Sequence, residues 1–277
     1  MSQLSIRPAL LLKWMNALLV KQGMYAADAE IVSRRLIEAE LLEQVSGGLR
    51  WLPRLLSAMD LGDIDPRAQI VTLLDLPALA VLDGSTGVGQ VAITQALQLG
   101  VAKATAVGSA TIVVKNSRPI GDPRVGLAAA TAHGCIAGVF TTCKAQTDPW
   151  PVGPSSVWGW STAESPLVTS GVNLSNDLPT IVLPTALAGT KSAAEKKKFF
   201  TDDAEYVCIV IDPAKCRPKA EFQVMAEHTA GKHVIGSPAW IFDSAQWPEL
   251  VDISEIAVRE LRDFAASARM PAEWIVR

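Results

Sequence analysis

The sequence predicts an α/β fold in which a sheet is covered by helices and preceded by a helical N-terminal part. Two observations lead to this prediction. Apolar residues recur at helical spacing through the first fifty positions, and further along short apolar runs alternate with helix-like segments. The chain has 277 residues, of which 49% are hydrophobic and 19% charged, so it is long enough to bury a large core.

The N-terminal part is predicted to contain two amphipathic helices followed by a third. Gly23 separates the first two, because glycine commonly ends a helix. A third helix-like segment follows Pro53, and the Gly62–Pro66 stretch is a turn. The positions at helical spacing are Leu11, Trp14, Met15, Leu18 and Leu19 in the first helix, and Ile31, Leu36, Ile37 and Leu41 in the second. We therefore expect the first fifty residues to be helical.

Strands and helices are predicted to alternate through the middle of the chain. The expected strands are 69–74, 78–84, 110–116, 135–143 and 206–213, and the expected helices are 88–108, 124–134 and 253–266. Residues 147–192 are rich in Pro, Gly, Ser and Trp, as extended or looping segments are. We expect a helical subdomain over 1–72, an α/β core resembling a cofactor-binding domain over 73–190, and a closing strand and helix over 191–277.

Composition argues against several classes of partner. Lys and Arg number 25 against 28 acidic residues, and the net charge of -3 provides no basic surface for nucleic acid or an anionic membrane. We expect no membrane span and no cleaved leader, because Lys13 interrupts the apolar run near the start. The four cysteines form no CxxC pair, so we expect a cytoplasmic protein without structural disulfides.

Two local patterns have structural interpretations. The Asp83–Gln90 stretch, DGSTGVGQ, lies between a strand and a helix, but its spacing fits neither a P-loop nor a dinucleotide-binding turn. We interpret its glycines as serving a tight strand-to-helix turn. His133 is predicted to lie at a helix end, and His228 and His233 lack the spacing of a zinc-binding helix. No metal site is therefore expected.

Taken in order, six stretches make the chain resemble the type-2 malate/L-lactate dehydrogenase family. They are DAEIVSRRLIEAELL, VSGGLRWLP, GDIDP, VLDGSTGVGQVAITQALQLGVAKA, VVKNSRPIG and CIVIDP with the helix that follows it. The family consists of NAD(P)-dependent oxidoreductases that are not of the Rossmann type, and it includes ureidoglycolate and sulfolactate dehydrogenases. The resemblance implies an atypical mixed sheet covered by helices, and NAD(P)H as cofactor if the family activity survives.

The family's first signature is an Arg-Gly-Val-x-Ser-His-Gly run followed by a second arginine. Ser46 and Gly48 match it, but the first arginine falls on Leu42, the histidine on Gly47 and the later arginine on Trp51. Arg50, one position away, is a candidate substitute for the later arginine. The resemblance therefore implies that the usual catalytic side chains are missing from an otherwise recognisable frame.

The second signature is an Asn-Ser-Asn-His-Phe-Gly run. Asn116, Ser117 and Gly121 match, whereas Arg118 and Pro119 replace Asn and His. The resemblance makes the three matching residues, together with Ser46 and Gly48, candidate cofactor-binding residues. A third signature, Gly-Thr-Asn-Pro, falls on either 159–162 or 163–166, and neither register keeps its threonine. The resemblance also implies that a Lys-Gly-containing helical section, which helps to hold the cofactor in the family, is missing here between LPTALAG and YVCIVIDP.

These departures lead to three hypotheses. The first is a dehydrogenase-like scaffold whose usual hydride-transfer site is degenerate and which serves a binding, partner or repurposed role. The second is an active NAD(P)H-dependent reductase of a small 2-oxo acid or cyclic imine that uses substitute residues. The third is a non-redox lyase or isomerase acting on a small acid, with Arg50, Arg54 and Arg118 as anion-binding candidates.

The reductase hypothesis needs a specific set of substitutes. Arg50 or Arg118 would pair with the substrate carboxylate, and Glu43, Lys115 or Glu164 would deliver the proton. The resemblance also implies a dimer with its sites near the subunit boundary. We therefore expect a homodimer, or a hetero-oligomer with an active relative.

Overall fold

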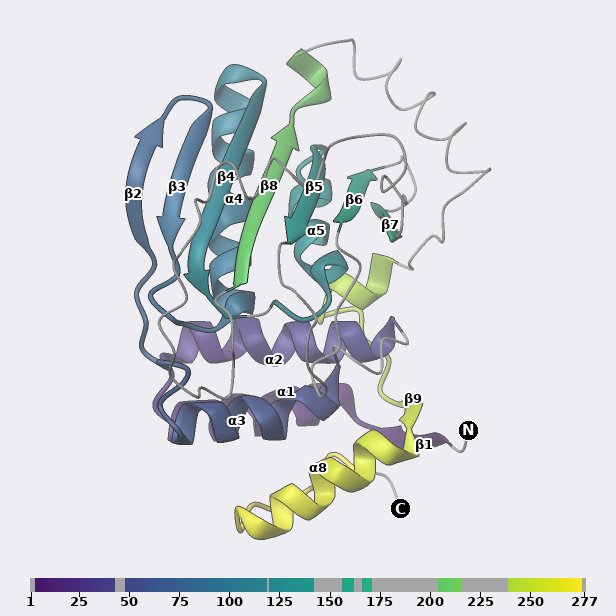
Figure 1. The fold of residues 1–277 in the computed structure, drawn as a ribbon. Helices are drawn as coiled ribbons and strands as arrows, with labels where there is room; N and C mark the ends of the chain where they lie inside the picture. The colour runs from purple at the N-terminus through teal and green to yellow at the C-terminus, as the bar shows by residue number, and fades with distance from the viewer. Residues whose placement is uncertain are drawn as a thin grey trace.

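The structure is a computed structural model of the 277-residue chain (Figure 1). It describes residues 3–42, 48–118, 120–141, 156–161, 166–170, 204–215 and 239–275. Helices α1 to α3 lie together below a large sheet, and α8 lies below them. The predicted α/β fold is confirmed: it is a mixed sheet with helices packed on it and a helical N-terminal part.

The N-terminal part consists of α1 (Pro8–Lys21), α2 (Ala26–Leu41), a short 3-10 helix η1 (Leu49–Trp51) and α3 (Leu52–Asp60). Pro8 opens α1, where its fixed φ suits the first helical position and its missing N–H costs nothing. Gly23 ends the α1 segment with a φ of +106°, which glycine adopts without steric cost. The predicted helices over this part of the chain are confirmed.

The large sheet contains β2 (Val71–Leu76), β3 (Leu79–Asp83), β4 (Ser109–Ser117), β5 (Ile136–Thr141), β6 (Ser156–Ser161), β7 (Pro166–Ser170) and β8 (Ala204–Ile211). The spatial order is β2-β3-β4-β8-β5-β6-β7. Among these described strands β3 and β4 pair in parallel, and every other neighbouring pair is antiparallel. β8 therefore inserts between β4 and β5, although it comes last in sequence.

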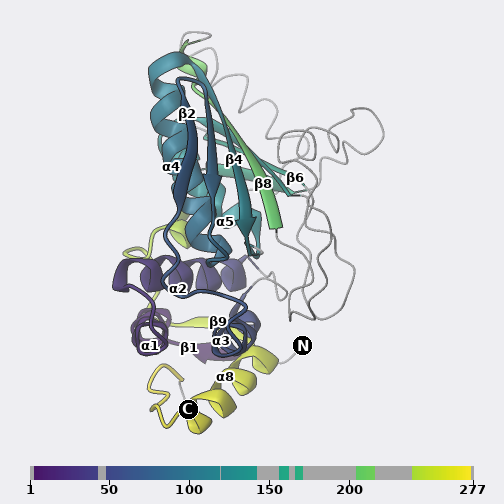
Figure 2. The same cartoon turned by 60° about the vertical axis from the view of Figure 1, so that its left-hand side comes forward.

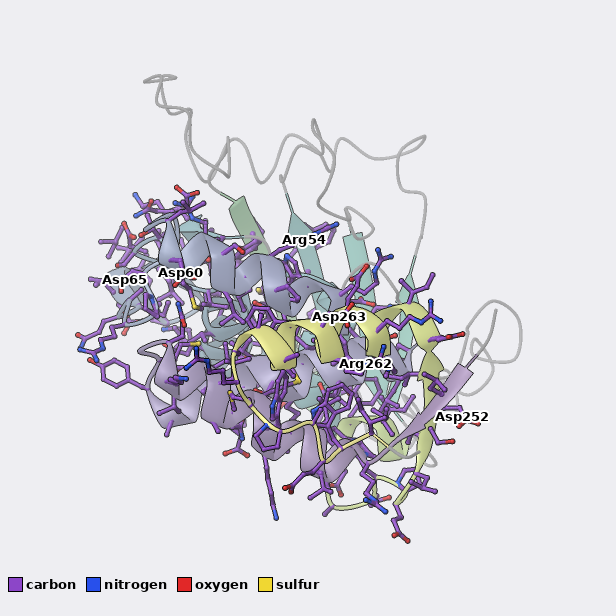
Figure 3. All side chains as sticks on the ribbon, turned by 90° about the horizontal axis from the view of Figure 1, so that it is seen from below. Arg54, Asp60, Asp65, Asp252, Arg262 and Asp263 are labelled. Atoms are coloured by element: carbon purple, nitrogen blue, oxygen red, sulfur yellow. The ribbon has the colours of Figure 1, made fainter. Side chains whose placement is uncertain are left out.

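Helices α4 (Gly89–Val107) and α5 (Pro123–Ala132) pack on the same face of this sheet (Figure 2). Their small and aliphatic residues form a core with the inward-facing residues of β3, β4, β5 and β8. A second core joins α1, α2, α3 and α8 (Glu255–Ser267). Figure 3 shows α8 lying across the helical part, with Arg262 and Asp263 on its exposed side. Each core buries one apolar helix face, as layered domains require.

The first segment differs from its prediction. Gln3–Ile6 is strand β1, not helix, and it pairs antiparallel with β9 (Val251–Ser254). Arg7 precedes a proline and has an extended backbone, so a helix cannot run through it from the N-terminal side. The same pairing holds Ile253 and Ser254 in a strand, so the last helix begins at Glu255 and not at Ile253. Pairing between distant segments overrides local propensity here.

Two kinds of feature are absent from the part of the chain that the structure describes. Within these ranges no helix is long and apolar enough to cross a membrane. In the same part of the chain no group of three His, Cys, Asp or Glu side chains is placed to hold a metal ion.

His133 caps the C-terminal end of α5, as its position before Gly134 predicts.

Candidate functional site

Asn116 lies at the end of β4 and anchors the turn between β3 and α4. Its φ of +55° is in the left-handed region, which asparagine tolerates better than most residues. The Asn116 Nδ2 donates to Asp83 Oδ1 at 2.8 Å, and the same oxygen accepts the backbone N–H of Ser85 at 2.7 Å. Asn116 thus holds the turn in place through a carboxylate that ends β3.

Ser117 and the Asp83–Gln90 turn approach each other closely. Ser117 is fully buried, and a Cβ added to Gly84 would lie 2.6 Å from the Ser117 Cβ. The positive φ angles of the turn fall on Ser85 and Thr86 and not on its glycines. Glycine therefore serves this turn at Gly84, but not through a positive φ. Gly84 is needed because the ends of β3 and β4 approach each other too closely for a Cβ.

Arg118 is buried behind the same turn. It is 2% exposed, and its Nε donates to the backbone carbonyl of Asp63 at 2.8 Å. The Arg118 carbonyl accepts the hydroxyl of buried Tyr206 from β8. The arginine therefore links the end of β4 to the segment after α3.

Gly48 and Leu49 pack on the buried carboxylate of Glu40 from α2. The Glu40 Oε2 accepts the backbone N–H of Leu49 at 3.0 Å, and a side chain at Gly48 would collide with that carboxylate. Burial raises the pKa of Glu40, while the Leu49 hydrogen bond and the nearby Arg50 favour its charged form. Gly48 therefore serves the fit between α2 and η1.

Arg50 points to α8. Its Nε and one terminal nitrogen bind the two carboxylate oxygens of Glu260 at 3.1 and 2.9 Å, in the bidentate geometry that arginine favours. The Glu260 hydrogen bond raises the pKa of Arg50 above its ordinary value. The guanidinium is already paired with a carboxylate from the chain itself.

Trp51 brings the first and second signature segments together. Its indole is buried, and its ring carbon Cζ3 lies 2.8 Å from the position that a Cβ on Gly121 would occupy. Gly121 has a φ of +72°, which also favours glycine. Trp51, which the resemblance places at the family's later arginine, thus packs its apolar ring against Gly121.

A sequence profile of the malate/L-lactate dehydrogenase family matches residues 6–159, which is more than half of the chain. The chain belongs to this family. Among curated relatives, an L-sulfolactate dehydrogenase of Methanocaldococcus jannaschii is 34% identical over 103 residues, covering 37% of this chain and 30% of that protein. A malate dehydrogenase of Pyrococcus abyssi is 30% identical over 166 residues, covering 60% of this chain and 46% of that protein. The matched segments therefore span less than half of these relatives.

Solved structures show the same fold over nearly the whole chain. Malate dehydrogenase from Pyrococcus horikoshii superposes with a TM-score of 0.76 at 17% identity, covering 97% of both chains. Sulfolactate dehydrogenase from Methanocaldococcus jannaschii gives 0.75 at 18% identity, covering 99% of this chain and 100% of that one. At these identities the structures show that the fold is shared, and the family match over residues 6–159 confirms the resemblance.

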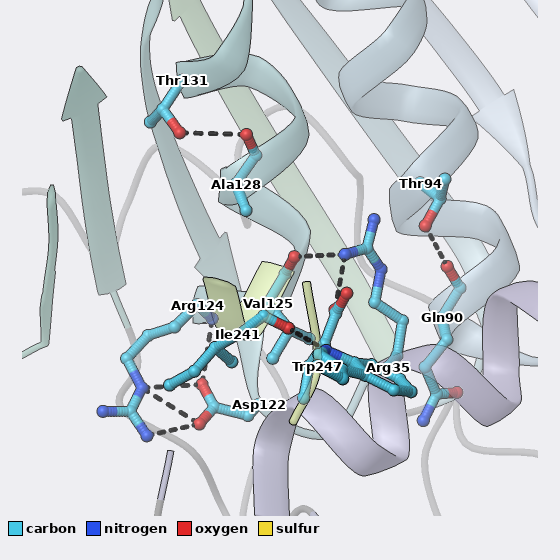
Figure 4. A network of polar contacts seen from close by, with 11 residues as sticks. Arg35, Gln90, Thr94, Asp122, Arg124, Val125, Ala128, Thr131, Ile241 and Trp247 are labelled. Atoms are coloured by element: carbon cyan, nitrogen blue, oxygen red, sulfur yellow. Dashed lines mark hydrogen bonds and ion pairs between the residues drawn. The ribbon is translucent and has the colours of Figure 1, made fainter. Parts of the chain in front are cut away.

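In this malate/L-lactate dehydrogenase family member, a buried cluster of polar contacts joins α2 to the start of α5 (Figure 4). Arg35 from α2 donates to Glu38 Oε2 at 2.8 Å and to the Val125 carbonyl at 2.5 Å. Among the described residues, neither Glu38 Oε1 nor Gln90 Oε1 has a hydrogen-bond partner. Burial raises the pKa of Glu38 to about 7, against the opposing effect of Arg35. A carboxyl at this pKa can hold a proton near neutral pH.

Sequence reasoning did not single out Glu38 or Glu40. The end of α2 is buried on all sides, because α2 lies between the helical part and the α4 and α5 layer. A one-sided apolar pattern does not reveal such a position. The available signal was the pair of acidic residues within a buried stretch, where an isolated carboxylate is costly.

Several candidates from the sequence are not brought into contact with this cluster. Lys115 is half-buried on β4 opposite Asp83, and Leu42 caps the end of α2. Gly159–Ser161 is part of β6, and Pro166 opens β7. The remaining candidates Glu43, Ser46, Gly47, Pro119 and Glu164 lie outside the described residues.

Replacing Glu38 with glutamine is expected to change how stability depends on pH. The folded protein raises this pKa from 4.5 to about 7, so the fold binds a proton more tightly than the unfolded chain. Protonated Glu38 therefore adds to the free energy of unfolding, on the order of 3 kcal/mol. This stabilisation is fully present below the unfolded pKa of 4.5 and is lost as the pH rises through about 7. Glu38→Gln stays neutral, so its urea-unfolding free energy should fall less over this window.

The matched control for this prediction is Glu30→Gln on the exposed side of α2, where Glu30 pairs with Arg34. The unfolding free energy of Glu30→Gln should depend on pH in the same way as that of the wild type. If Glu38→Gln and wild type lose stability in parallel between about pH 4.5 and pH 7, Glu38 does not hold a proton in the fold.

Proposed function

We propose that this family member keeps the fold but has lost the usual hydride-transfer site, and that it acts through binding and not through reduction of a 2-oxo acid. The observation that supports this most is the buried Trp51 ring against Gly121, at the position that the resemblance gives to the family's later arginine. The ligand that we propose is a small organic acid, and the proposed location of the protein is the cytoplasm.

The chemistry of the family explains why this replacement matters. Reducing a 2-oxo acid needs a proton donor at the developing alkoxide and a guanidinium that pairs with the carboxylate. The resemblance aligns these roles with Gly47, Leu42 and Trp51, none of which can perform them. Loss of the general acid alone costs on the order of a hundred- to ten-thousand-fold in rate.

The substitute residues of the reductase hypothesis are engaged elsewhere. Arg50 holds Glu260 through two hydrogen bonds, and the buried Arg118 donates to the Asp63 carbonyl. The Arg50 guanidinium would have to leave the Glu260 carboxylate before it could pair bidentately with a substrate carboxylate, and Arg118 would have to pair from a buried position. The non-redox alternative uses these two arginines together with Arg54, and the contacts of Arg50 and Arg118 favour it no more than the reductase hypothesis.

A titration with NADH and with NADPH tests the cofactor part of this proposal. Nucleotide is added to the full-length protein while tryptophan emission and energy transfer to the nicotinamide are followed. We expect no saturable signal up to about 1 mM nucleotide, which corresponds to less than about 4 kcal/mol of binding free energy. Saturation in the micromolar range would contradict the proposal and favour the reductase hypothesis.

A further inference from the structure

The carboxylate of Glu260 from α8 covers the end of the Arg50 side chain. Its two oxygens accept from Arg50 Nε at 3.1 Å and from one terminal nitrogen at 2.9 Å. A guanidinium binds the carboxylate of a free acid in this same side-on geometry. Glu260 therefore occupies the position on Arg50 that the carboxylate of a small acid would take.

The pair of Arg50 and Glu260 lies at the surface, where it can open. The Arg50 side chain is 35% exposed and the Glu260 side chain is 41% exposed. Ion pairs with this exposure contribute little to stability, because water solvates both charges when they separate. Opening this pair therefore leaves no buried charge without a partner, in contrast to the buried pair of Asp122 and Arg124.

Neither α8 nor η1 needs this pair to stay in place. The residues that hold α8 in the helical core are Ala257, Val258, Leu261 and Ala265. The start of η1 is held separately, because the buried Glu40 accepts the Leu49 N–H and Leu49 belongs to the same core. The backbone of Arg50 therefore keeps its position when the Glu260 side chain leaves.

A second carboxylate lies close to the same guanidinium. Burial raises the pKa of Glu40, and repulsion from Glu260 raises it further. The Leu49 hydrogen bond and the charge of Arg50 act in the opposite direction. When Glu260 leaves, its repulsion with Glu40 ends, and Arg50 still has the charge of Glu40 near it. An acid that takes the place of Glu260 restores the original balance of charge.

We propose that Glu260 is an autoinhibitory residue: it occupies the carboxylate-binding side of Arg50, and a small organic acid binds there when Glu260 turns away. The inference rests on the proposed function, from which it takes the class of ligand, and it adds what controls binding. The free acid and Glu260 compete for one guanidinium. The apparent affinity for the acid is therefore lowered by the fraction of molecules in which Arg50 is already paired.

Calorimetric titration of the full-length protein with malonate tests this competition. Malonate is a small acid without an oxo group that could be reduced, so the heat reports binding alone. Glu260→Gln removes the competing charge and keeps the size of the side chain. We expect its affinity for malonate to be about five times that of the wild type, as follows from the small contribution of an exposed ion pair.

Two further variants show where the gain arises. Glu255→Gln makes the same change of charge on the same helix, at a residue that pairs with Arg259. Its affinity for malonate should equal that of the wild type. Arg50→Gln, added to Glu260→Gln, removes the guanidinium and should cancel the gain. Circular dichroism spectra of each variant show that the fold is kept.

The outcomes separate the autoinhibition from the proposed function. Equal affinities of the wild type and Glu260→Gln would overturn the autoinhibition and leave acid binding in place. An equal gain in Glu255→Gln, or a gain that persists without Arg50, would also overturn it, because the effect would then come from elsewhere. Heat that saturates in none of the proteins would overturn both the autoinhibition and acid binding. Saturable binding of NADH would contradict the proposed function alone.

Discussion

Replacing Asp122 with alanine is expected to lower the free energy of unfolding by about 3–5 kcal/mol. Asp122 and Arg124 form a buried pair, with Arg124 Nε at 3.0 Å from both carboxylate oxygens and a terminal nitrogen at 2.5 Å from one (Figure 4). Asp122 also caps α5 by accepting the Arg124 backbone N–H at 2.9 Å. Alanine would leave a buried guanidinium unpaired and remove a helix cap. Urea unfolding followed by circular dichroism measures the loss.

The control is the exposed ion pair between Glu30 and Arg34 on α2, which has a similar separation of 2.8 Å. Glu30→Ala should change the free energy of unfolding by no more than about 1 kcal/mol, because solvent screens the pair. Equal losses in Asp122→Ala and Glu30→Ala would show that burial of the Asp122 pair has no energetic consequence.

Replacing Gly121 with alanine is expected to cost about 2–5 kcal/mol of unfolding free energy, through two effects. The φ of +72° is unfavourable for a residue with a Cβ, by about 1–2 kcal/mol. The new Cβ would also lie 2.8 Å from the Trp51 ring, so the indole or the loop must move, which costs about 1–3 kcal/mol more. The loss is again measured by urea unfolding.

Gly62 separates these two effects. Its φ of +75° nearly equals that of Gly121, but no heavy atom lies within 4 Å of the Cβ that alanine would add. Gly62→Ala should therefore cost only the conformational part, about 1–2 kcal/mol. If the two glycine variants lose the same stability, the Trp51 ring is not packed against Gly121, and the main support for the proposed function fails.

Much of the fold was predictable because its helices and strands are locally encoded. The apolar spacing from Leu11 to Leu41 defines α1 and α2. The aliphatic runs of β4 and β8 are strands buried at the centre of the sheet. The positions that the resemblance assigns to the family's signatures could also be named from the sequence, since a resemblance aligns positions without any coordinates.

The other features depend on contacts between distant segments. β1 becomes a strand only because β9, about 250 residues later, pairs with it. Arg50 forms a bidentate ion pair with Glu260, which lies 210 positions away. The raised pKa of Glu38 follows from the layers around α2, which no local pattern contains. In each case local sequence sets the residue type, and tertiary packing decides its role.

The most direct test of the proposed function is a turnover assay. Purified protein is mixed with NADH or NADPH and a panel of 2-oxo acids and cyclic imines, and nicotinamide absorbance is followed for wild type and for Arg118→Ala. We predict no nucleotide oxidation above the protein-free blank with any substrate, in either protein. Substrate-dependent oxidation by the wild type that Arg118→Ala abolishes would contradict the account and establish an active reductase.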